Sequence, residues 1–225
     1  MAGGRCRCGR WVALVAMLIA VRLVAADPAA PGFWARLGRL FAPGPAERVV
    51  LCHRQSAYFD IVVEQDADNL RHLVFLPNRG SQTIIDPAAP DRPVSAYVKY
   101  VFLALPALGR PPERVLFIGL GGGIMPRIFR RYFPEAAVDI VELDPVVVEL
   151  AETYFSYRRD ERTTLYLEDG RAFLNRDGPR YDIIFLDAYN AEAIPFHLTT
   201  REFFVTIGGR LAPGGIIAVN SAELS

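Results

Sequence analysis

Three carboxylates each stand at the end of a run of β-like residues: Glu142 after AVDIV, Asp169 after TTLYLE, and Asp187 after YDIIFL. A glycine cluster, Gly119–Gly123, ends a fourth run of this kind, VLFI. Glycines between a strand and a helix allow the backbone to approach a ligand closely. A carboxylate at the end of the following strand, as at Glu142, can accept hydrogen bonds from both ribose hydroxyls. The spacing therefore predicts a nucleoside-binding site.

The charge of this cluster narrows the choice of nucleoside. The P-loop pattern is absent, because no Gly-Lys-Ser/Thr follows the glycines, and the third glycine of a dinucleotide loop falls at Ile124. Three carboxylates on one rim would repel a pyrophosphate and attract a sulfonium cation. The pattern favours a sulfonium nucleoside over a dehydrogenase cofactor. The alternative is that acids such as Asp144 and Asp169 only cap helices.

The carboxylates have to be positioned by alternating strands and helices. The runs predict strands at 114–119, 137–143, 163–168, 181–187 and 215–220, and helices at 124–133, 145–155, 170–176 and 199–211. Continuous apolar strands that alternate with helices indicate a parallel sheet covered on both faces. Ligands of such sheets lie at the carboxyl ends of the strands, where the predicted acids stand.

A smaller β unit precedes this pattern. Short runs rich in Val, Ile, Leu and aromatic residues predict strands in two hairpins, within 49–53, 58–64, 71–76 and 82–86. We place this unit at 47–92. The transferase domain follows at 93–225 and begins with an apolar helix at 94–105.

The N-terminus has the pattern of a signal peptide. Three arginines precede the apolar run 11–21, and small residues follow at 24 and 26. Residues 1–26 are expected to be a cleaved export signal or an uncleaved membrane anchor, although the run is short for a bilayer span. A mis-assigned start site would instead leave the protein in the cytoplasm. Residues 27–46, rich in Pro, Gly and Ala, are expected to be a linker.

The composition indicates a single domain and gives no sign of a nucleic-acid or metal partner. With 225 residues, 52% of them hydrophobic, the chain suits one globular domain. A formal net charge of 0 does not indicate a nucleic-acid partner. Cys6 and Cys8 are too close together for a zinc site, and we expect no metal.

Over residues 56–220 the sequence resembles the polyamine aminopropyltransferases, or spermidine synthases. The resemblance is carried by SAYFDIVV, VLFIGLGGG, VELDP, EDGRAF, YDIIFLDA, LAPGG and IPFHLTTREFF, the last of which is similar to a bacterial spermidine-synthase-like subgroup. It implies a Rossmann-like class I S-adenosylmethionine-dependent transferase fold. It also implies transfer of an aminopropyl group from decarboxylated S-adenosylmethionine to a small amine, in polyamine biosynthesis.

The resemblance assigns roles to matching residues. It implies that the nucleoside is held by Gly119, Gly121, Gly123, Glu142, Asp169 and Gly170. It implies that Asp187 is the general base. The chemistry requires such a base, because an ammonium has no lone pair with which to attack.

The amine-binding half matches less well. Tyr58 and Tyr97 match the substrate-side tyrosines, but Phe59 replaces a glutamine, and Gly122 and Asn190 replace aspartates. A diamine with two charged ends favours a carboxylate at each end. An S-adenosylmethionine-dependent methyltransferase and a catalytically inactive nucleoside-binding module therefore remain alternatives.

Tyr189 and His197 have two possible roles each, and the end of the chain predicts an open sheet edge. Tyr189 either stacks on a substrate or covers the pocket, and His197 either contacts the substrate or has a structural role. The family adds two strands after the fifth, so the C-terminal strands are expected to be missing. An open sheet edge could then pair with a second copy in a homodimer.

Overall fold

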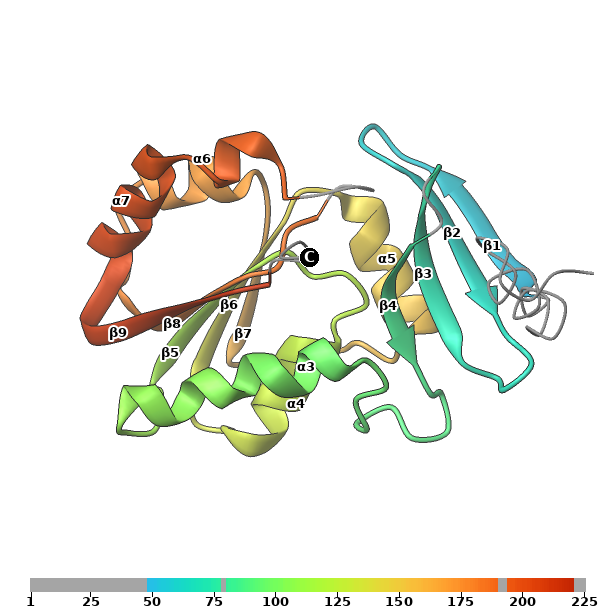
Figure 1. The fold of residues 1–225 in the computed structure, drawn as a ribbon, viewed down its shortest axis with the longest axis horizontal. Helices are drawn as coiled ribbons and strands as arrows, with labels where there is room; N and C mark the ends of the chain where they lie inside the picture. The colour runs from blue at the N-terminus through green and yellow to red at the C-terminus, as the bar shows by residue number, and fades with distance from the viewer. Residues whose placement is uncertain (1–47, 78–79, 190–193, 221–225) are drawn as a thin grey trace, which may run out of the picture. The chain divides into compact units, whose positions relative to one another are not determined.

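A computed structural model describes residues 48–77, 80–189 and 194–220 (Figure 1). The predicted signal segment 1–26, the linker 27–46 and Asn190 lie outside these residues. In the described part of the chain, no helix has the length and apolar character needed to cross a bilayer.

The N-terminal β unit is one antiparallel sheet. Its strands are β1 (Val49–Gln55), β2 (Asp60–Gln65), β3 (Arg71–Leu76) and β4 (Ser81–Ile85), in the order β1-β2-β3-β4. Asp66 makes the turn between β2 and β3, because its Oδ1 accepts hydrogen bonds from the N–H groups of Asp68 and Leu70. The predicted strands are confirmed, and the two expected hairpins are joined into one sheet.

The second sheet is parallel. Its strands are β5 (Arg114–Ile118), β6 (Ala137–Glu142), β7 (Thr163–Leu167), β8 (Tyr181–Leu186) and β9 (Leu211–Val219). The strand order is β7-β6-β5-β8-β9. Strands β6 and β7 are added on one side of β5, and β8 and β9 are added on its other side. The strand order therefore reverses between β5 and β8, and the carboxyl ends of these two strands flank the crevice in which such sheets bind ligands.

Helices cover both faces of the parallel sheet (Figure 1). They are α3 (Ala96–Val101), the 3-10 helix η1 (Phe102–Leu108), α4 (Ile124–Tyr132), α5 (Pro145–Tyr154), α6 (Gly170–Asn175), the 3-10 helix η2 (Phe196–Leu198) and α7 (Arg201–Arg210). Alternation along β5 divides the core: Val115 and Phe117 pack with α4 and α5, and Leu116 and Ile118 pack with α6 and α7. The predicted α/β class is confirmed.

Two predicted elements differ in detail. The helix expected at 94–105 becomes a 3-10 helix after Val101, in the segment where Pro106 lacks a backbone N–H to continue an α-helix. The LAPGG turn lies inside β9, since Leu211 pairs with Tyr181 and the next pair is Ile216 with Ile183. The intervening residues bulge out of the ladder.

The β unit packs against the domain that contains the parallel sheet. The Ser56 hydroxyl donates to Asp144 Oδ2, and Arg71 donates to the Tyr154 carbonyl at 2.9 Å. Thr83 Oγ1 accepts from the Gly122 N–H at 2.9 Å. Strands β2 and β3 thus share one hydrophobic core with β5, and the β unit is held over the glycine loop.

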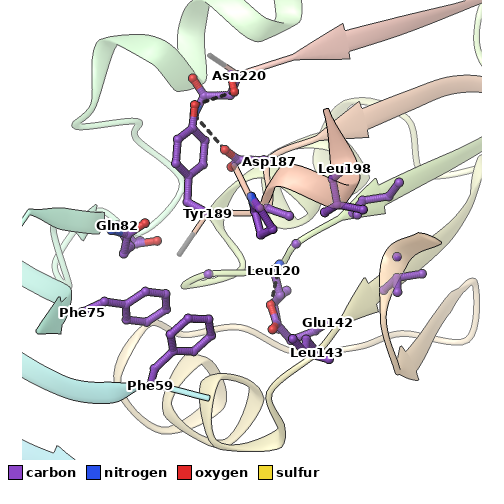
Figure 2. Close-up of a pocket in the computed structure, with 18 of the residues that line it drawn as sticks. Phe59, Phe75, Gln82, Leu120, Glu142, Leu143, Asp187, Tyr189, Leu198 and Asn220 are labelled. Carbon is purple, nitrogen blue, oxygen red and sulfur yellow. Dashed lines mark hydrogen bonds between the residues drawn. The ribbon is translucent and has the colours of Figure 1, made fainter. Parts of the chain in front are cut away.

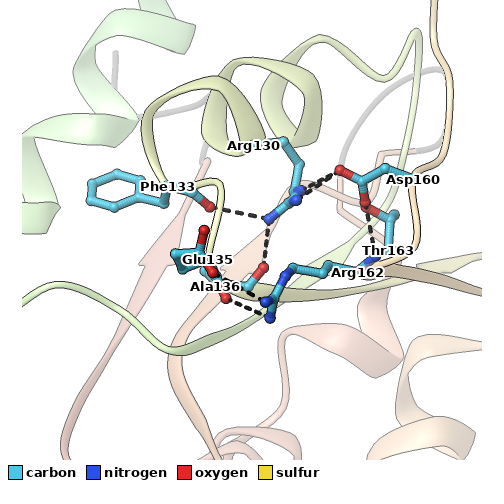
Figure 3. A network of polar contacts seen from close by, with 7 residues as sticks. All are labelled: Arg130, Phe133, Glu135, Ala136, Asp160, Arg162 and Thr163. Carbon is cyan, nitrogen blue, oxygen red and sulfur yellow. Dashed lines mark hydrogen bonds and ion pairs between the residues drawn. The ribbon is translucent and has the colours of Figure 1, made fainter.

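An arginine network joins the segments that precede β6 and β7, at the amino ends of these strands (Figure 3). Arg130, on α4, donates to the carbonyls of Phe133 and Ala136 at 3.1 and 2.6 Å. Its Nε also donates to Asp160 at 2.8 Å, and its side chain is 16% exposed. The nearby Arg162–Glu135 ion pair is largely exposed. Arg130 therefore joins the end of α4 to the segment before β7.

Replacing Arg130 with alanine is expected to lower the free energy of unfolding by about 2–3 kcal/mol, because two carbonyls and one carboxylate lose a charged donor. The matched variant Arg162→Ala should cost less than about 1 kcal/mol, as exposed ion pairs do. Urea denaturation measures both. Equal losses would contradict the structural role of Arg130.

Candidate active site

A cavity of about 540 Å³ lies at the carboxyl ends of β5, β6 and β8, beneath the β unit (Figure 2). Its volume is within the roughly 300–1,000 Å³ usual for ligand pockets. Most of the residues predicted from the sequence line it: Tyr97, Gly119, Gly121, Glu142, Asp169, Gly170, Asp187, Tyr189 and His197. The fold thus brings together residues that are up to 100 positions apart in the chain.

Steric contacts explain why glycines occupy the loop after β5. Gly119 has a φ of +98°, and a Cβ atom there would lie 2.3 Å from the Asp187 carbonyl oxygen. A side chain would push apart β5 and β8, which carry the loop and the predicted base. Gly123 does not line the cavity. It begins α4 with a φ of +71°, and a Cβ would lie 2.4 Å from the Tyr157 ring.

Glu142 lies at the end of β6 and is held by backbone groups. Its Oε2 accepts from the Leu120 N–H at 2.9 Å (Figure 2). Its Oε1 accepts from the Asp144 N–H, also at 2.9 Å. Burial raises the pKa of Glu142, and these hydrogen bonds oppose that rise. Each carboxylate oxygen retains a lone pair that can accept from a ribose hydroxyl.

Asp169 combines two roles that the sequence left as alternatives. Its Oδ1 caps α6, accepting from the N–H groups of Arg171 and Ala172 at 2.9 Å. Its Oδ2 lies 2.7 Å from His197 Nε2. Partial burial would raise the pKa of Asp169, but the hydrogen bonds from Ala172 and His197 lower it overall. An adenine amino group would share Oδ2 with His197.

Asp187 directly follows β8, and its carboxylate accepts a hydrogen bond from the side chain of Asn220. Asn220 Nδ2 donates to its Oδ1 at 2.7 Å, and Tyr189 donates to the Asn220 carbonyl at 2.6 Å (Figure 2). The Asp187 side chain faces the cavity and is only partly exposed, and its burial raises its pKa to about 6. A carboxyl group with this pKa is suited to general-base work near neutral pH.

Tyr97 reaches the cavity from α3. Burial, together with the nearby Asp187 and Tyr189, raises the pKa of its hydroxyl far above the ordinary value. The hydroxyl therefore stays protonated and can donate a hydrogen bond at neutral pH.

Two residues named in the sequence analysis, Asp144 and Tyr58, lie outside the cavity lining. The side chain of Asp144 is fully buried, where it caps α5 and accepts from Ser56. Tyr58 is 51% exposed and is not part of the lining, because Ser56 turns the chain so that Phe59 faces the cavity instead.

The lining residues that were not identified from the sequence include Phe75, Gln82, Thr83 and Asn220. The first three come from β3 and β4 of the other sheet, and no motif marks them. Asn220 directly follows β9, and a polar residue at the end of a parallel strand was a usable signal.

The lining is strongly anionic. It contains the carboxylates of Glu142, Glu168, Asp169 and Asp187, and among the described lining residues there is no lysine or arginine. Such a cavity favours a cationic ligand. Among the residues that the structure describes, no group of three or more His, Cys, Asp or Glu is placed to hold a metal, and the absence of a metal cofactor stays a prediction.

Known proteins share this sequence and fold. A polyamine aminopropyltransferase of Vibrio vulnificus (strain CMCP6) is 36% identical over 198 residues, covering 85% of this chain and 66% of that protein. An eEF1A lysine and N-terminal methyltransferase of Danio rerio is 44% identical over 119 residues, covering 48% of this chain and 17% of that protein. The chain thus spans just under two thirds of the length of the Vibrio relative.

The fold is also found in a solved structure. A probable spermidine synthase from Corynebacterium glutamicum ATCC 13032 superposes with a TM-score of 0.65 at 23% identity, covering 80% of this chain and 64% of that one. The model of the spermine/spermidine synthase domain matches residues 97–224, from α3 to beyond β9. On this match, which covers more than half of the chain, the chain belongs to the spermine/spermidine synthase domain family.

Proposed function

We propose that the protein transfers an aminopropyl group from decarboxylated S-adenosylmethionine to an amine. The observation that carries the proposal is the Asp187 carboxylate, held beside the glycine loop in an anionic cavity. The Vibrio relative, a polyamine aminopropyltransferase, supports it.

Different residues of the cavity bind the donor and deprotonate the acceptor. Glu142 accepts from the ribose hydroxyls, and the carboxylates around the cavity stabilise the sulfonium charge. The acceptor nitrogen attacks the methylene carbon next to sulfur, so that an N–C bond forms while the C–S bond breaks. Sulfur leaves as the neutral thioether of methylthioadenosine. Asp187, ionised above its pKa of about 6, takes the proton from the attacking amine.

The charge of the lining favours the decarboxylated donor. S-adenosylmethionine carries a carboxylate that the aminopropyl donor lacks. Among the described lining residues there is no lysine or arginine to pair with that carboxylate, and four acids would repel it.

Methyl transfer from S-adenosylmethionine is the second candidate. It is favoured by the Danio relative, a methyltransferase that matches 48% of this chain. The same nucleoside half would serve both reactions, so the donor decides between them.

The products of turnover distinguish the two reactions. The full chain is incubated with each donor and a panel of amines, and nucleoside products are separated by chromatography. Methylthioadenosine, formed only with the decarboxylated donor, is the expected result. S-adenosylhomocysteine formed from the carboxylated donor would favour methyl transfer. Neither product, without measurable binding of either donor, would contradict both and support an inactive module.

We also propose that residues 1–26 direct the protein to export or to a membrane, which their basic and apolar pattern supports. Fractionation of cells that express the full chain tests this. Recovery of uncleaved chain in the cytoplasmic fraction would contradict it.

A further inference from the structure

Asn220, which directly follows β9, is joined by three hydrogen bonds to the segment that carries Asp187. Its backbone N–H donates to the Leu186 carbonyl at 3.0 Å, which continues the pairing of Val219 with Leu186. Its carbonyl accepts from the Tyr189 hydroxyl at 2.6 Å, and its side-chain Nδ2 donates to Asp187 Oδ1 at 2.7 Å (Figure 2). The backbone contacts on both sides of Asp187 therefore fix where this amide stands relative to the carboxylate.

The main chain of Asp187 is held by the neighbouring strand β5. Its backbone N–H donates to the Ile118 carbonyl at 2.9 Å. A carboxylate on a fixed main chain can still rotate about its side-chain torsions. The hydrogen bond from Asn220 to Oδ1 restricts this rotation, as a supporting residue does for a group that has to react.

The second oxygen of Asp187 is left for a ligand. In the part of the chain that the structure describes, Asn220 is the side chain that donates to this carboxylate, and it engages Oδ1 alone. An ionised carboxylate accepts at both of its oxygens. The side chain lines the cavity, so Oδ2 remains to accept the proton of an amine bound there.

The same hydrogen bond opposes the effect of burial on Asp187. Burial raises the pKa of the carboxyl group and the Asn220 amide lowers it, with a net value of about 6. A hydrogen bond donated to the charged form favours that form. Without this donor the carboxyl group would keep its proton at a higher pH, and a protonated carboxyl group cannot act as a base.

We propose that Asn220 is the positioning residue of the general base: its amide holds Asp187 Oδ1, so that Oδ2 is left to accept the proton of the attacking amine. Tyr189 acts one step further away, because its hydroxyl holds the Asn220 carbonyl. This inference goes beyond the proposed function and rests on it for the role of Asp187 as the base.

Replacing Asn220 with leucine tests the proposal, because it removes the donor and keeps a side chain of similar size. We expect the inflection of kcat/KM to move up by at least about one pH unit. The ratio of variant to wild-type kcat/KM should then be about 5-fold lower at pH 6 than at pH 9. A purely structural loss would lower kcat/KM by the same factor at every pH.

Two features keep this comparison clean. The other titratable residues of the lining are unchanged in the variant, so their titration cancels in the ratio: Tyr97, Glu142, Glu168, Asp169, Tyr189 and His197. Asn175→Leu, at an exposed position outside the lining, is the matched control and should follow the wild-type profile.

The protonation of Asp187 can also be measured without turnover. The ¹³C chemical shift of its carboxyl carbon, assigned by its loss in Asp187→Asn, should titrate near pH 6 in the wild type. In Asn220→Leu it should titrate at least about one unit higher. Asn220→Asp keeps the size of the side chain, and its two adjacent carboxyl groups should titrate as a pair with one apparent pKa well above 6. An unchanged titration in both Asn220 variants would overturn the proposal.

The two readouts separate this inference from the proposed function. Turnover with the same pH profile in Asn220→Leu and in the wild type would uphold aminopropyl transfer and overturn the role of Asn220. A raised titration of Asp187 in Asn220→Leu, in a protein that releases no methylthioadenosine with any amine, would uphold the action of Asn220 on this carboxylate and contradict the transfer.

Discussion

Replacing Asp187 with asparagine is expected to lower kcat/KM by about 10²–10⁴-fold, the usual contribution of a general base. The amide retains the oxygen that accepts from Asn220 Nδ2, so the geometry at the end of β8 is kept. Donor affinity should change little, because Glu142 and the glycine loop are untouched. Initial rates of methylthioadenosine release and calorimetry with the decarboxylated donor measure the two effects.

The same carboxyl group predicts the pH dependence of the rate. Its pKa is raised to about 6, and only the ionised form can accept a proton. In the wild-type protein kcat/KM should therefore fall as the pH is lowered through about 6. Asp187→Asn should lose this inflection. The exposed Asp177→Asn, outside the cavity lining, is the control and should match the wild type in rate and profile.

Asp187→Asn is also expected to stabilise the fold at neutral pH. The folded pKa lies above the unfolded value of 3.8, so the folded state binds the proton more tightly between these values. Wild-type stability therefore falls as the pH rises from about 4 to about 6, and the asparagine variant avoids this loss. Its free energy of unfolding near pH 7.5 should be higher by about 2 kcal/mol. A variant that keeps the wild-type rate, or is less stable near neutral pH, would contradict the role given to Asp187.

Replacing Glu142 with glutamine is expected to weaken donor binding by roughly 100-fold or more, since hydrogen bonds to a charged acceptor contribute about 1.5–3 kcal/mol each. In the wild type, the oxygens of Glu142 face the N–H groups of Leu120 and Asp144. An amide nitrogen must replace one of these oxygens, so one N–H loses its acceptor and a ribose hydroxyl loses a charged partner. Calorimetry with methylthioadenosine gives the dissociation constants.

Two controls separate ribose binding from general electrostatics. Glu168→Gln removes a charge from the same lining without touching the glycine loop, and should weaken binding far less. A 2′-deoxy analogue should bind the wild type more weakly than methylthioadenosine does, while Glu142→Gln should discriminate little between the two. Equal losses in both glutamine variants would show that Glu142 acts only through its charge.

Local sequence was sufficient to predict the parallel sheet and the acids that line the cavity. The apolar runs of β5, β6 and β8 are recognisable because strands buried on both faces have to be continuously apolar. Parallel strands end at one edge of their sheet, so Glu142, Asp169 and Asp187 could be placed together from their positions in the chain. Gly119 and Gly121 have positive φ, which glycine adopts readily, and this explains why the loop after β5 is rich in glycine.

Tertiary structure decided which residues of the β unit line the cavity and which partners each acid has. Phe59 and Phe75 stack only because β2 and β3 pair in one register, and Thr83 reaches Gly122 only because the β unit packs over the loop. His197 meets Asp169 across 28 positions of chain. Periodicity reports which face of an element is buried, but contacts between separate elements depend on packing and on the path of the loops between them. For that reason the carboxylates that line the cavity could be predicted from residue spacing, whereas the residues of the β unit that line it could not.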